Sequence, residues 1–215
     1  MPLPRFTRLP ANEQRRILDV AQRIFAEDGV ETASYNQIIA AAGISKSSAY
    51  NYFDGREDLL YTALDDVAAR LAEVLGTWRE VADDAEFWSQ LKTIEQRLRA
   101  HIETHPADLA LIDPAFLLRE QGAFMSWIAD FVANGIAIGI ITVETDRNLL
   151  VAATAAVLRA VDGWGAAEMK AGRTPDPDQA WILLRNLWGT PPVRPNRTGP
   201  TARVAGDHRR LGHRD

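Results

Sequence analysis

Residues 43–53, GISKSSAYNYF, combine short polar side chains with aromatic rings and are the part of this sequence best suited to chemistry with a partner. Serine hydroxyls can donate or accept a hydrogen bond at the edge of a base, and Lys46 can reach guanine or a phosphate. Tyr50 and Tyr52 carry phenolic hydroxyls that can reach phosphate oxygens beside a groove. Such a run can contact the bases and phosphates of double-stranded DNA if a helix presents it to a groove.

Two short helices joined by a tight turn would hold this run in place. Residues 35–42 end in three alanines, which permit close helix packing, and Gly43 can adopt the left-handed conformation of a turn. Ile44 can fill the angle between the helices, and Ser45 is a preferred N-cap for the second one. This order is typical of helix-turn-helix modules, whose second helix enters the major groove with its first residues toward the bases. The turn alone is equally compatible with a helical hairpin that buries its tyrosines in a core.

The predicted DNA-binding residues extend beyond the turn on both sides. Ser34 is placed to cap the helix that begins at Tyr35, and Phe53 should turn inward and lock the second helix. Arg56 lies at the start of the following helix, where a guanidinium and the helix N-terminus together suit an anion. The full set is Ser34, Tyr35, Ser45, Lys46, Ser47, Ser48, Tyr50, Asn51, Tyr52 and Arg56.

Helical periodicity dominates the rest of the chain and predicts an all-α fold. A first helix is expected from about Asn12 to Asp28, with Gly29 as its stop. A long helix should start near residue 55 and run to Trp78, as the only rigid link between the two halves of the chain. Further helices are expected at about 85–105, 115–140, 145–172 and 177–189.

The order of residues 15–60 resembles the N-terminal domain of the TetR family of transcriptional regulators. The residues that match the family pattern in unbroken register are Ala21, Phe25, Gly29, Ser34, Ile38, Ala42, Gly43, Ile44, Ser45, Tyr50, Phe53, Glu57 and Leu59. Arg56 stands where the family usually has lysine, and beyond residue 60 only the number, length and order of the helices are similar. The resemblance implies a homodimer that binds operator DNA, most often as a repressor, with a C-terminal domain for a small-molecule effector.

The chain divides into three expected regions. Residues 1–54 should form a three-helix helix-turn-helix DNA-binding domain, and residues 55–189 a helical bundle for ligand binding and dimerisation. Residues 190–215 are rich in proline, glycine and arginine, and should form a disordered basic tail because they cannot bury enough apolar surface to fold. We expect the arginines of this tail to be solvated rather than bound to DNA.

Large apolar residues of the second region supply candidates for an effector pocket and for a dimer interface. The pocket is expected between two helices that carry Phe87, Leu91, Phe124, Trp127 and Phe131, although aromatic stripes most often form an ordinary core. An alanine- and glycine-rich helix at 149–169 permits close packing, and with the last helix it predicts half of a four-helix interface. The interface residues are Leu158, Trp164, Trp181, Leu184 and Trp188, with an intramolecular core as the alternative.

Composition argues against several other classes of protein. The chain of 215 residues has no cysteine, which excludes disulfides and thiolate metal sites. It lacks common nucleotide-binding and hydrolase motifs, so we expect neither catalysis nor a cofactor. His101 and His105 could bind a metal from one helix turn, but we expect none there. The apolar stretch 131–143 is short for a membrane span and no signal peptide is recognisable, so we expect a cytoplasmic protein that contacts no membrane.

The charge distribution predicts local rather than bulk attraction to DNA. The formal net charge is −5, and residues 1–60 carry 7 basic and 8 acidic side chains. DNA contacts in that segment must therefore come from the placement of individual cations. The near-neutral segment also fits a helical interaction protein that has lost DNA binding, and a small-molecule enzyme on a helical scaffold is a third alternative.

Overall fold

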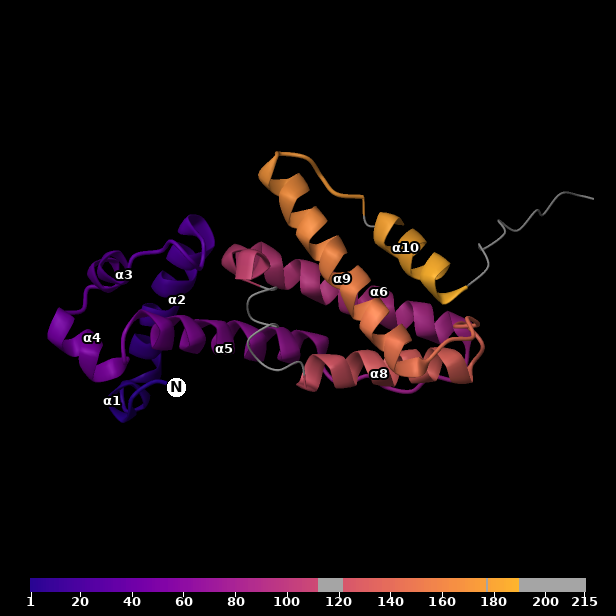
Figure 1. Ribbon diagram of the computed structural model, residues 1–215, viewed down its shortest axis with the longest axis horizontal. Helices are drawn as coiled ribbons and strands as arrows, with labels where there is room; N and C mark the ends of the chain where they lie inside the picture. Colours follow the sequence, from indigo (N-terminus) through magenta and orange to yellow (C-terminus); the bar gives the residue numbers. More distant parts are fainter. Residues whose placement is uncertain (112–121, 177, 190–215) are drawn as a thin grey trace, which may run out of the picture.

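All regular elements of the described residues are helices, so the expected all-α fold is confirmed (Figure 1). The computed structural model describes residues 1–111, 122–176 and 178–189. The helices are α1 (Pro4–Thr7), α2 (Ala11–Asp28), α3 (Tyr35–Ala41), α4 (Lys46–Tyr52), α5 (Arg56–Leu75), α6 (Asp84–Thr104), α8 (Gly122–Ala137), α9 (Arg147–Lys170) and α10 (Asp178–Trp188), with a further helical stretch at residues 106–111. Helices α1 to α4 form one end of the molecule, and α5 runs from there into a bundle of α6, α8, α9 and α10 (Figure 1).

Glycines end the two long helices of the N-terminal half. Gly29 takes a φ of 87° after α2, and Gly76 takes a φ of 65° after α5. Glycine adopts this left-handed backbone at little cost, and the conformation stops a helix. Helix α5 therefore ends at Leu75, and its expected continuation to Trp78 is wrong. Helix α2 begins one residue before its predicted start.

The remaining helices lie close to their predicted positions. Helices α6, α9 and α10 agree within a few residues with the stretches expected at 85–105, 145–172 and 177–189. The described part of α8 falls inside the stretch expected at 115–140. The start of that stretch and the tail expected at 190–215 lie outside the described residues.

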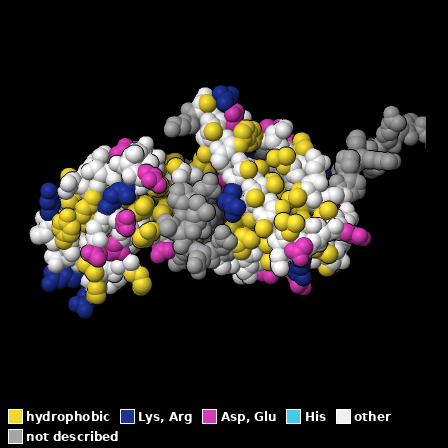
Figure 2. All heavy atoms as spheres, in the orientation of Figure 1, with side chains coloured by type: hydrophobic (Ala, Val, Ile, Leu, Met, Phe, Trp, Pro, Cys, Tyr) yellow, Lys and Arg dark blue, Asp and Glu magenta, His cyan; other side chains and the backbone are white. Residues whose placement is uncertain are grey.

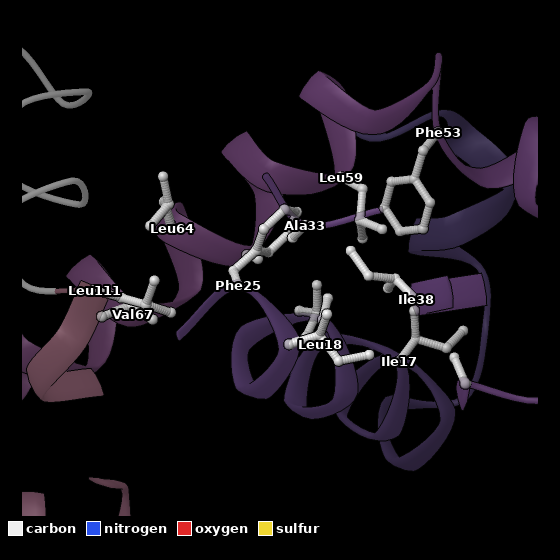
Figure 3. Close-up of a cluster of buried hydrophobic side chains, with 14 of the residues drawn as sticks. Ile17, Leu18, Phe25, Ala33, Ile38, Phe53, Leu59, Leu64, Val67 and Leu111 are labelled. Atoms are coloured by element: carbon white, nitrogen blue, oxygen red, sulfur yellow. The ribbon is translucent and has the colours of Figure 1, made fainter. Parts of the chain in front are cut away.

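The first hydrophobic core joins α1 to α5 and extends to the helical stretch at residues 106–111 (Figure 3). Phe25 of α2, Ile38 of α3 and Phe53 after α4 all contribute to it, and each is at most 1% exposed. Leu111 joins the same cluster from the C-terminal half and is fully buried. The core of the helix-turn-helix module therefore continues well beyond residue 54, along α5 and into the second half of the chain.

The second core is aromatic and lies in the bundle of α6, α8, α9 and α10. Trp78 lies in the loop after α5, and its ring centroid is 5.2 Å from that of Phe87 and 5.7 Å from that of Phe131. The ring of Trp188, from α10, lies 5.7 Å from Phe131 on another side. Edge-on and tilted contacts at these distances are the geometry that aromatic pairs prefer. Asn134 of α8 anchors the loop, because its side-chain oxygen accepts a hydrogen bond from Trp78 Nε1 at 3.0 Å.

A buried polar network ties the N-terminal module to the bundle. Arg70 of α5 donates to the two carboxylate oxygens of Asp108, at 3.1 and 2.6 Å, and also binds Asp66. His101 Nε2 of α6 lies 2.8 Å from an oxygen of Asp108, and Gln22 of α2 donates to Asp66 at 2.9 Å. The network thus connects α2, α5, α6 and the stretch at residues 106–111. Helix α5 is therefore not the only link between the two halves, contrary to the sequence-based expectation.

Candidate nucleic-acid interface

The turn between α3 and α4 has the conformation that the sequence predicts. Gly43 takes a φ of 64°, and the backbone N–H of Ile44 donates to the carbonyl oxygen of Ile39 at 3.1 Å. Arg16 of α2 donates to the carbonyl oxygen of Ala42, so α2 supports the turn from behind. Ala49 of α4 faces inward and is fully buried, and its small side chain lets α4 approach the rest of the module closely. These contacts hold α4 in one orientation.

The first turn of α4 presents hydroxyls and one lysine to solvent. Ser45 is the N-cap, and its Oγ accepts a hydrogen bond from the backbone N–H of Ser48 at 3.1 Å. The hydroxyl oxygens of Ser47 and Ser48 each lie 2.9 Å from Ser45 Oγ. Lys46 and Ser47 are exposed, whereas Ser48 is half-buried. Ser45 therefore serves first as a helix cap, and Lys46 and Ser47 are the groups best placed to meet a base or a phosphate.

The outer face of α4 continues into its second turn. Tyr50 is 61% exposed, and Asn51 is also exposed and donates through Nδ2 to the carbonyl oxygen of Ser47 at 2.8 Å. Side chains three and four residues apart lie on the same side of a helix, so Lys46, Ser47, Tyr50 and Asn51 form one exposed polar face. We call these four residues the α4 face. A polar face on a rigidly held second helix is the geometry that reading of the major groove requires.

Helix α1 holds the C-terminal end of α4. The backbone N–H of Leu3 donates to the carbonyl oxygen of Tyr52 at 2.8 Å, and Phe6 is 2% exposed with its ring 4.7 Å from that of Phe53. The ring of Tyr52 lies 6.3 Å from Phe6 and is half-buried, so Tyr52 belongs partly to the core and is not part of the exposed α4 face. Helix α1 was not expected from the sequence, although Pro4, which suits a first helical turn, is a signal for it.

Tyr35 lies at the start of α3, next to the α4 face. Its ring packs edge-on against Tyr50, with the centroids 5.8 Å apart. Its hydroxyl is buried and makes no hydrogen bond with the described residues. Burial raises the pKa of Tyr35, and the nearby Tyr50 and Asp58 raise it further, so the hydroxyl stays protonated at neutral pH. Tyr35 therefore packs against Tyr50 beside the α4 face and keeps its neutral hydroxyl buried.

Known proteins share the sequence pattern of this module. Residues 17–63 match the model of the family described as bacterial regulatory proteins, tetR family. The chain belongs to the TetR family. The matched residues begin within α2 and end within α5, so they cover α3, the turn and α4 completely.

Solved structures share the fold over most of this TetR-family chain. The fatty acid degradation regulator FadR from Bacillus halodurans has a TM-score of 0.61 at 16% identity, covering 84% of this chain and 96% of that one. A TetR-like transcriptional regulator from Rhodococcus sp. RHA1 has a TM-score of 0.59 at 22% identity, covering 85% and 97%. At these identities the likeness establishes the fold alone.

Curated relatives share the N-terminal part of the chain. The HTH-type transcriptional repressor AcnR of Corynebacterium glutamicum is 36% identical over 66 residues, which is 31% of this chain and 35% of that protein. AcnR of Corynebacterium diphtheriae is 30% identical over 129 residues, which is 60% of this chain and 62% of that protein. The chain thus spans between 35% and 62% of the length of these two relatives.

Arg56 of this TetR-family chain points inward rather than toward a phosphate. Its Nε donates to the carbonyl oxygen of Ala33 at 2.7 Å, and its Nη2 donates to the carbonyl oxygen of Val30. The guanidinium also lies 5.6 Å from the ring centroid of Phe25. Carbonyls in the loop between α2 and α3 lack helical partners, and the arginine satisfies them. The predicted phosphate contact is therefore wrong for Arg56.

Ser34 stands at the N-cap of α3 but makes no capping side-chain hydrogen bond, so its hydroxyl remains exposed.

The predicted effector-pocket residues of the TetR-family bundle belong to the second core. Phe87, Leu91, Trp127 and Phe131 are between 0 and 9% exposed, and Phe124 packs against the same cluster. The rings of Trp127 and Phe131 lie 5.1 Å apart, so side chains fill this space in the present structure. The indole N–H of Trp127 is buried and has no hydrogen-bond partner among the described residues. An unpaired donor of this kind is uncommon in a protein interior, and no sequence signal predicts it.

The predicted dimer residues divide between the core and the surface. Leu184 and Trp188 are 1% and 0% exposed, and the indole N–H of Trp188 donates to a threonine hydroxyl of α9 at 3.1 Å. Their assignment to a dimer interface is therefore wrong, because they belong to the intramolecular core that was the alternative. Leu158 and Trp181 are half-buried, and Trp164 is 39% exposed.

A different set of apolar residues is exposed on the last two helices. We call it the α9–α10 face, and it consists of Leu149, Ala156, Ala160 and Trp164 on α9 with Ile182 and Leu183 on α10. Leu149 is 61% exposed, and Ile182 and Leu183 are each 51% exposed. Residues 147–169 are long and apolar enough to cross a membrane by length and composition, and 22% of their most apolar part is buried. Hydrophobic side chains are visible over the bundle where α9 crosses it (Figure 2).

The two candidate metal-binding histidines have structural contacts instead. His101 contacts Asp108, and the ring of His105 stacks on that of His101 with centroids 4.5 Å apart. His105 is also the C-cap residue of α6. The described residues contain no group of three or more histidine, cysteine, aspartate or glutamate side chains placed to hold a metal ion.

Proposed function

We propose that the protein is a homodimeric transcriptional regulator that binds operator DNA through α4. The observation that carries this proposal is the α4 face, an exposed polar surface on a helix that a capped turn and α1 hold in place. Small hydroxyl-bearing side chains allow close approach to base edges, while Lys46 and Tyr50 extend to guanine or phosphate. We propose a cytoplasmic repressor, a role that the names of the AcnR relatives state for those proteins.

Two copies of α4 need a two-fold interface to reach both halves of a palindromic operator. The half-sites of helix-turn-helix dimers lie about one helical turn apart, and the symmetry of the protein matches that of the DNA. We place the interface on the α9–α10 face, because exposed large apolar side chains flank small residues there. Small residues let two helices approach closely, and covering Leu149, Ile182 and Leu183 removes apolar surface from water.

A small apolar effector would release the DNA by entering the second core. A ligand between α6 and α8 must displace packed rings and thereby shift α6, and an acceptor atom on it could pair with the free indole N–H of Trp127. The shift reaches Asp108 through His101 of α6, and then α5 and α2 through the bonds of Arg70 with Asp108 and Gln22. To lower operator affinity a hundredfold, the effector must bind the DNA-free protein about 2.7 kcal/mol more tightly than the DNA-bound protein. By the same linkage, DNA must weaken effector binding a hundredfold.

Tyr50→Phe should weaken operator binding by about 1 kcal/mol without changing base preference, because it removes one phosphate-reaching hydroxyl and keeps the ring against Tyr35. Lys46→Ala should weaken binding and, where the lysine reads guanine, also change preference at one position. Competition binding across single-base operator variants measures both effects. A changed preference in Tyr50→Phe together with none in Lys46→Ala would contradict this assignment of roles.

Trp127→Phe should destabilise the protein less than Trp78→Phe. Both tryptophans are 9% exposed, but Trp78 Nε1 donates to Asn134 at 3.0 Å, whereas the indole N–H of Trp127 has no hydrogen bond to any described residue that the substitution could remove. The expected difference in the free energy of unfolding is about 1 kcal/mol, the usual net contribution of one hydrogen bond. Urea denaturation measures it. Equal losses would mean that the Trp127 donor is already satisfied, and would remove the reason for placing a ligand acceptor beside it.

Selection of bound fragments from a random duplex library tests the proposed function with the full chain. We expect enrichment of a palindromic sequence whose binding weakens steeply as salt is added, since phosphate contacts release counterions. A folded protein that enriches no sequence would instead be an interaction protein that has lost DNA binding. Turnover of a bound small molecule would indicate an enzyme.

A further inference from the structure

The basic side chains of residues 1–60, all of which the structure describes, fall into two groups. Four are bound by other groups of the protein: Arg15 by Asp66 at 2.9 Å, Arg16 by the Ala42 carbonyl, Arg23 by Glu27 at 3.3 Å and Arg56 by the Ala33 carbonyl at 2.7 Å. The side chains of Arg5, Arg8 and Lys46 are exposed and make no ion pair or hydrogen bond within the described chain. Residues 1–60 carry no net positive charge, so attraction to phosphates must come from individual cations. Arg5, Arg8 and Lys46 are the cations of this segment that the protein does not already bind.

Two of the three free cations belong to the segment that is fixed to α4: Arg5 lies within α1, and Arg8 is its C-cap residue. Phe6, between the two arginines in sequence, is 2% exposed and packs on Phe53, while Leu3 N–H donates to Tyr52 at the end of α4. Arg5 and Arg8 therefore extend from an anchored segment rather than from a free arm. Lys and Arg side chains gather at the end of the molecule formed by α1 and α4 (Figure 2).

The free cations bracket the α4 face. Lys46 is the first residue of α4, and α1 packs at its last residue. A seven-residue helix is about 10 Å long, and the major groove is about 12 Å wide. Cations at the two ends of α4 can thus reach the backbones on the two sides of the groove that α4 occupies.

We propose that Arg5 and Arg8 bind DNA phosphates at the side of the groove opposite Lys46, so that α1 and α4 form one DNA-binding surface. This inference rests on the proposed DNA-binding function and extends it to a segment outside the helix-turn-helix. The two arginines contribute affinity without base preference, because phosphate contacts position a protein but do not read sequence.

The slope of log affinity against log salt tests the proposal, with the full chain and a short labelled duplex of mixed sequence. Arg5→Gln with Arg8→Gln should reduce the slope by about 0.9 for each phosphate that the variant no longer neutralises, up to about 3.6 in a dimer that uses all four arginines. Arg5→Lys with Arg8→Lys should keep the wild-type slope, since the charge remains. Circular dichroism and melting temperature should be unchanged in both variants.

Arg23→Gln with Arg99→Gln is the matched control. It removes the same number of charges from exposed pairs with Glu27 and Glu95, at 3.3 and 2.9 Å, and should leave the slope unchanged. A wild-type slope in the Arg5/Arg8 glutamine variant, or an equal fall in the control, would overturn the inference and leave the proposed function intact. Absence of salt-dependent DNA binding in the wild type would overturn the proposed function itself.

Discussion

Ile182→Asp combined with Leu183→Asp should give a folded monomer with little affinity for operator DNA. Each native side chain is 51% exposed, so an aspartate at either position is hydrated in the monomer but would be buried without a partner in the proposed interface. A monomer engages one half-site at a time and loses the gain from linked binding, which is about 10²- to 10⁴-fold. Sedimentation at micromolar concentration measures the oligomeric state, and fluorescence anisotropy with labelled operator measures the affinity.

Trp188→Asp is the control from the other side of the same helix. Trp188 is fully buried in the second core, and truncating a buried tryptophan costs about 3–5 kcal/mol even before a charge is introduced. This variant should therefore lose helical circular dichroism at a temperature where the Ile182/Leu183 variant remains folded. A dimeric Ile182/Leu183 variant, or a wild type that sediments as a monomer, would contradict the placement of the interface on the α9–α10 face.

Asp108→Ala should lower the free energy of unfolding by about 3–5 kcal/mol, because it removes the more deeply buried of the two carboxylates that pair with Arg70. The side chain of Asp108 is 1% exposed and that of Arg70 is 13% exposed. Burial alone would lower the pKa of Arg70, but its hydrogen bond to Asp108 and the charge of Asp66 raise it above the ordinary value. When Asp108 is removed, the charge of Asp66 and its hydrogen bond still raise the pKa of Arg70, so the guanidinium stays charged. Urea denaturation measures the loss.

Glu95→Ala is the corresponding control on α6. Glu95 accepts a hydrogen bond from Arg99 at 2.9 Å in an exposed pair one helix turn apart, and such pairs contribute about 0.3–0.5 kcal/mol. Hydrogen exchange should separate the two variants further, because the Asp108 network reaches α2 through Gln22. Asp108→Ala should increase exchange in α2, and Glu95→Ala should not. Equal small losses of stability in both variants would contradict a structural link through Asp108.

Local chemistry explains which parts of the fold the sequence predicts well. Gly43 and Ser45 act within a few residues of themselves, one by its backbone conformation and the other by capping α4, so their roles are legible in the sequence. The apolar spacing of α2 likewise predicts a helix with one buried side. The family pattern covers the same stretch, which is why the resemblance and the local chemistry identify the same module.

Contacts between residues far apart in the sequence explain what it could not predict. Helix α10 has seven apolar residues among its eleven, on its exposed side as well as on its buried side. Composition alone therefore does not distinguish Trp188, which faces the core, from Ile182 and Leu183, which face solvent. Arg56 binds carbonyls of a loop more than twenty residues away, and Arg70 binds Asp108, which lies 38 residues further along the chain. Periodicity within one helix carries no information on such partners.

Hydroxyl-radical footprinting of the full-length protein on the selected operator is the decisive test of a dimer that reads DNA through α4, because it reports where the protein covers the DNA backbone. We predict two protected patches on one side of the duplex, related by two-fold symmetry and about one helical turn apart. The Ile182→Asp/Leu183→Asp variant should weaken both patches together. A single patch, or uniform weak protection that does not depend on sequence, would contradict a dimeric regulator that reads DNA through α4.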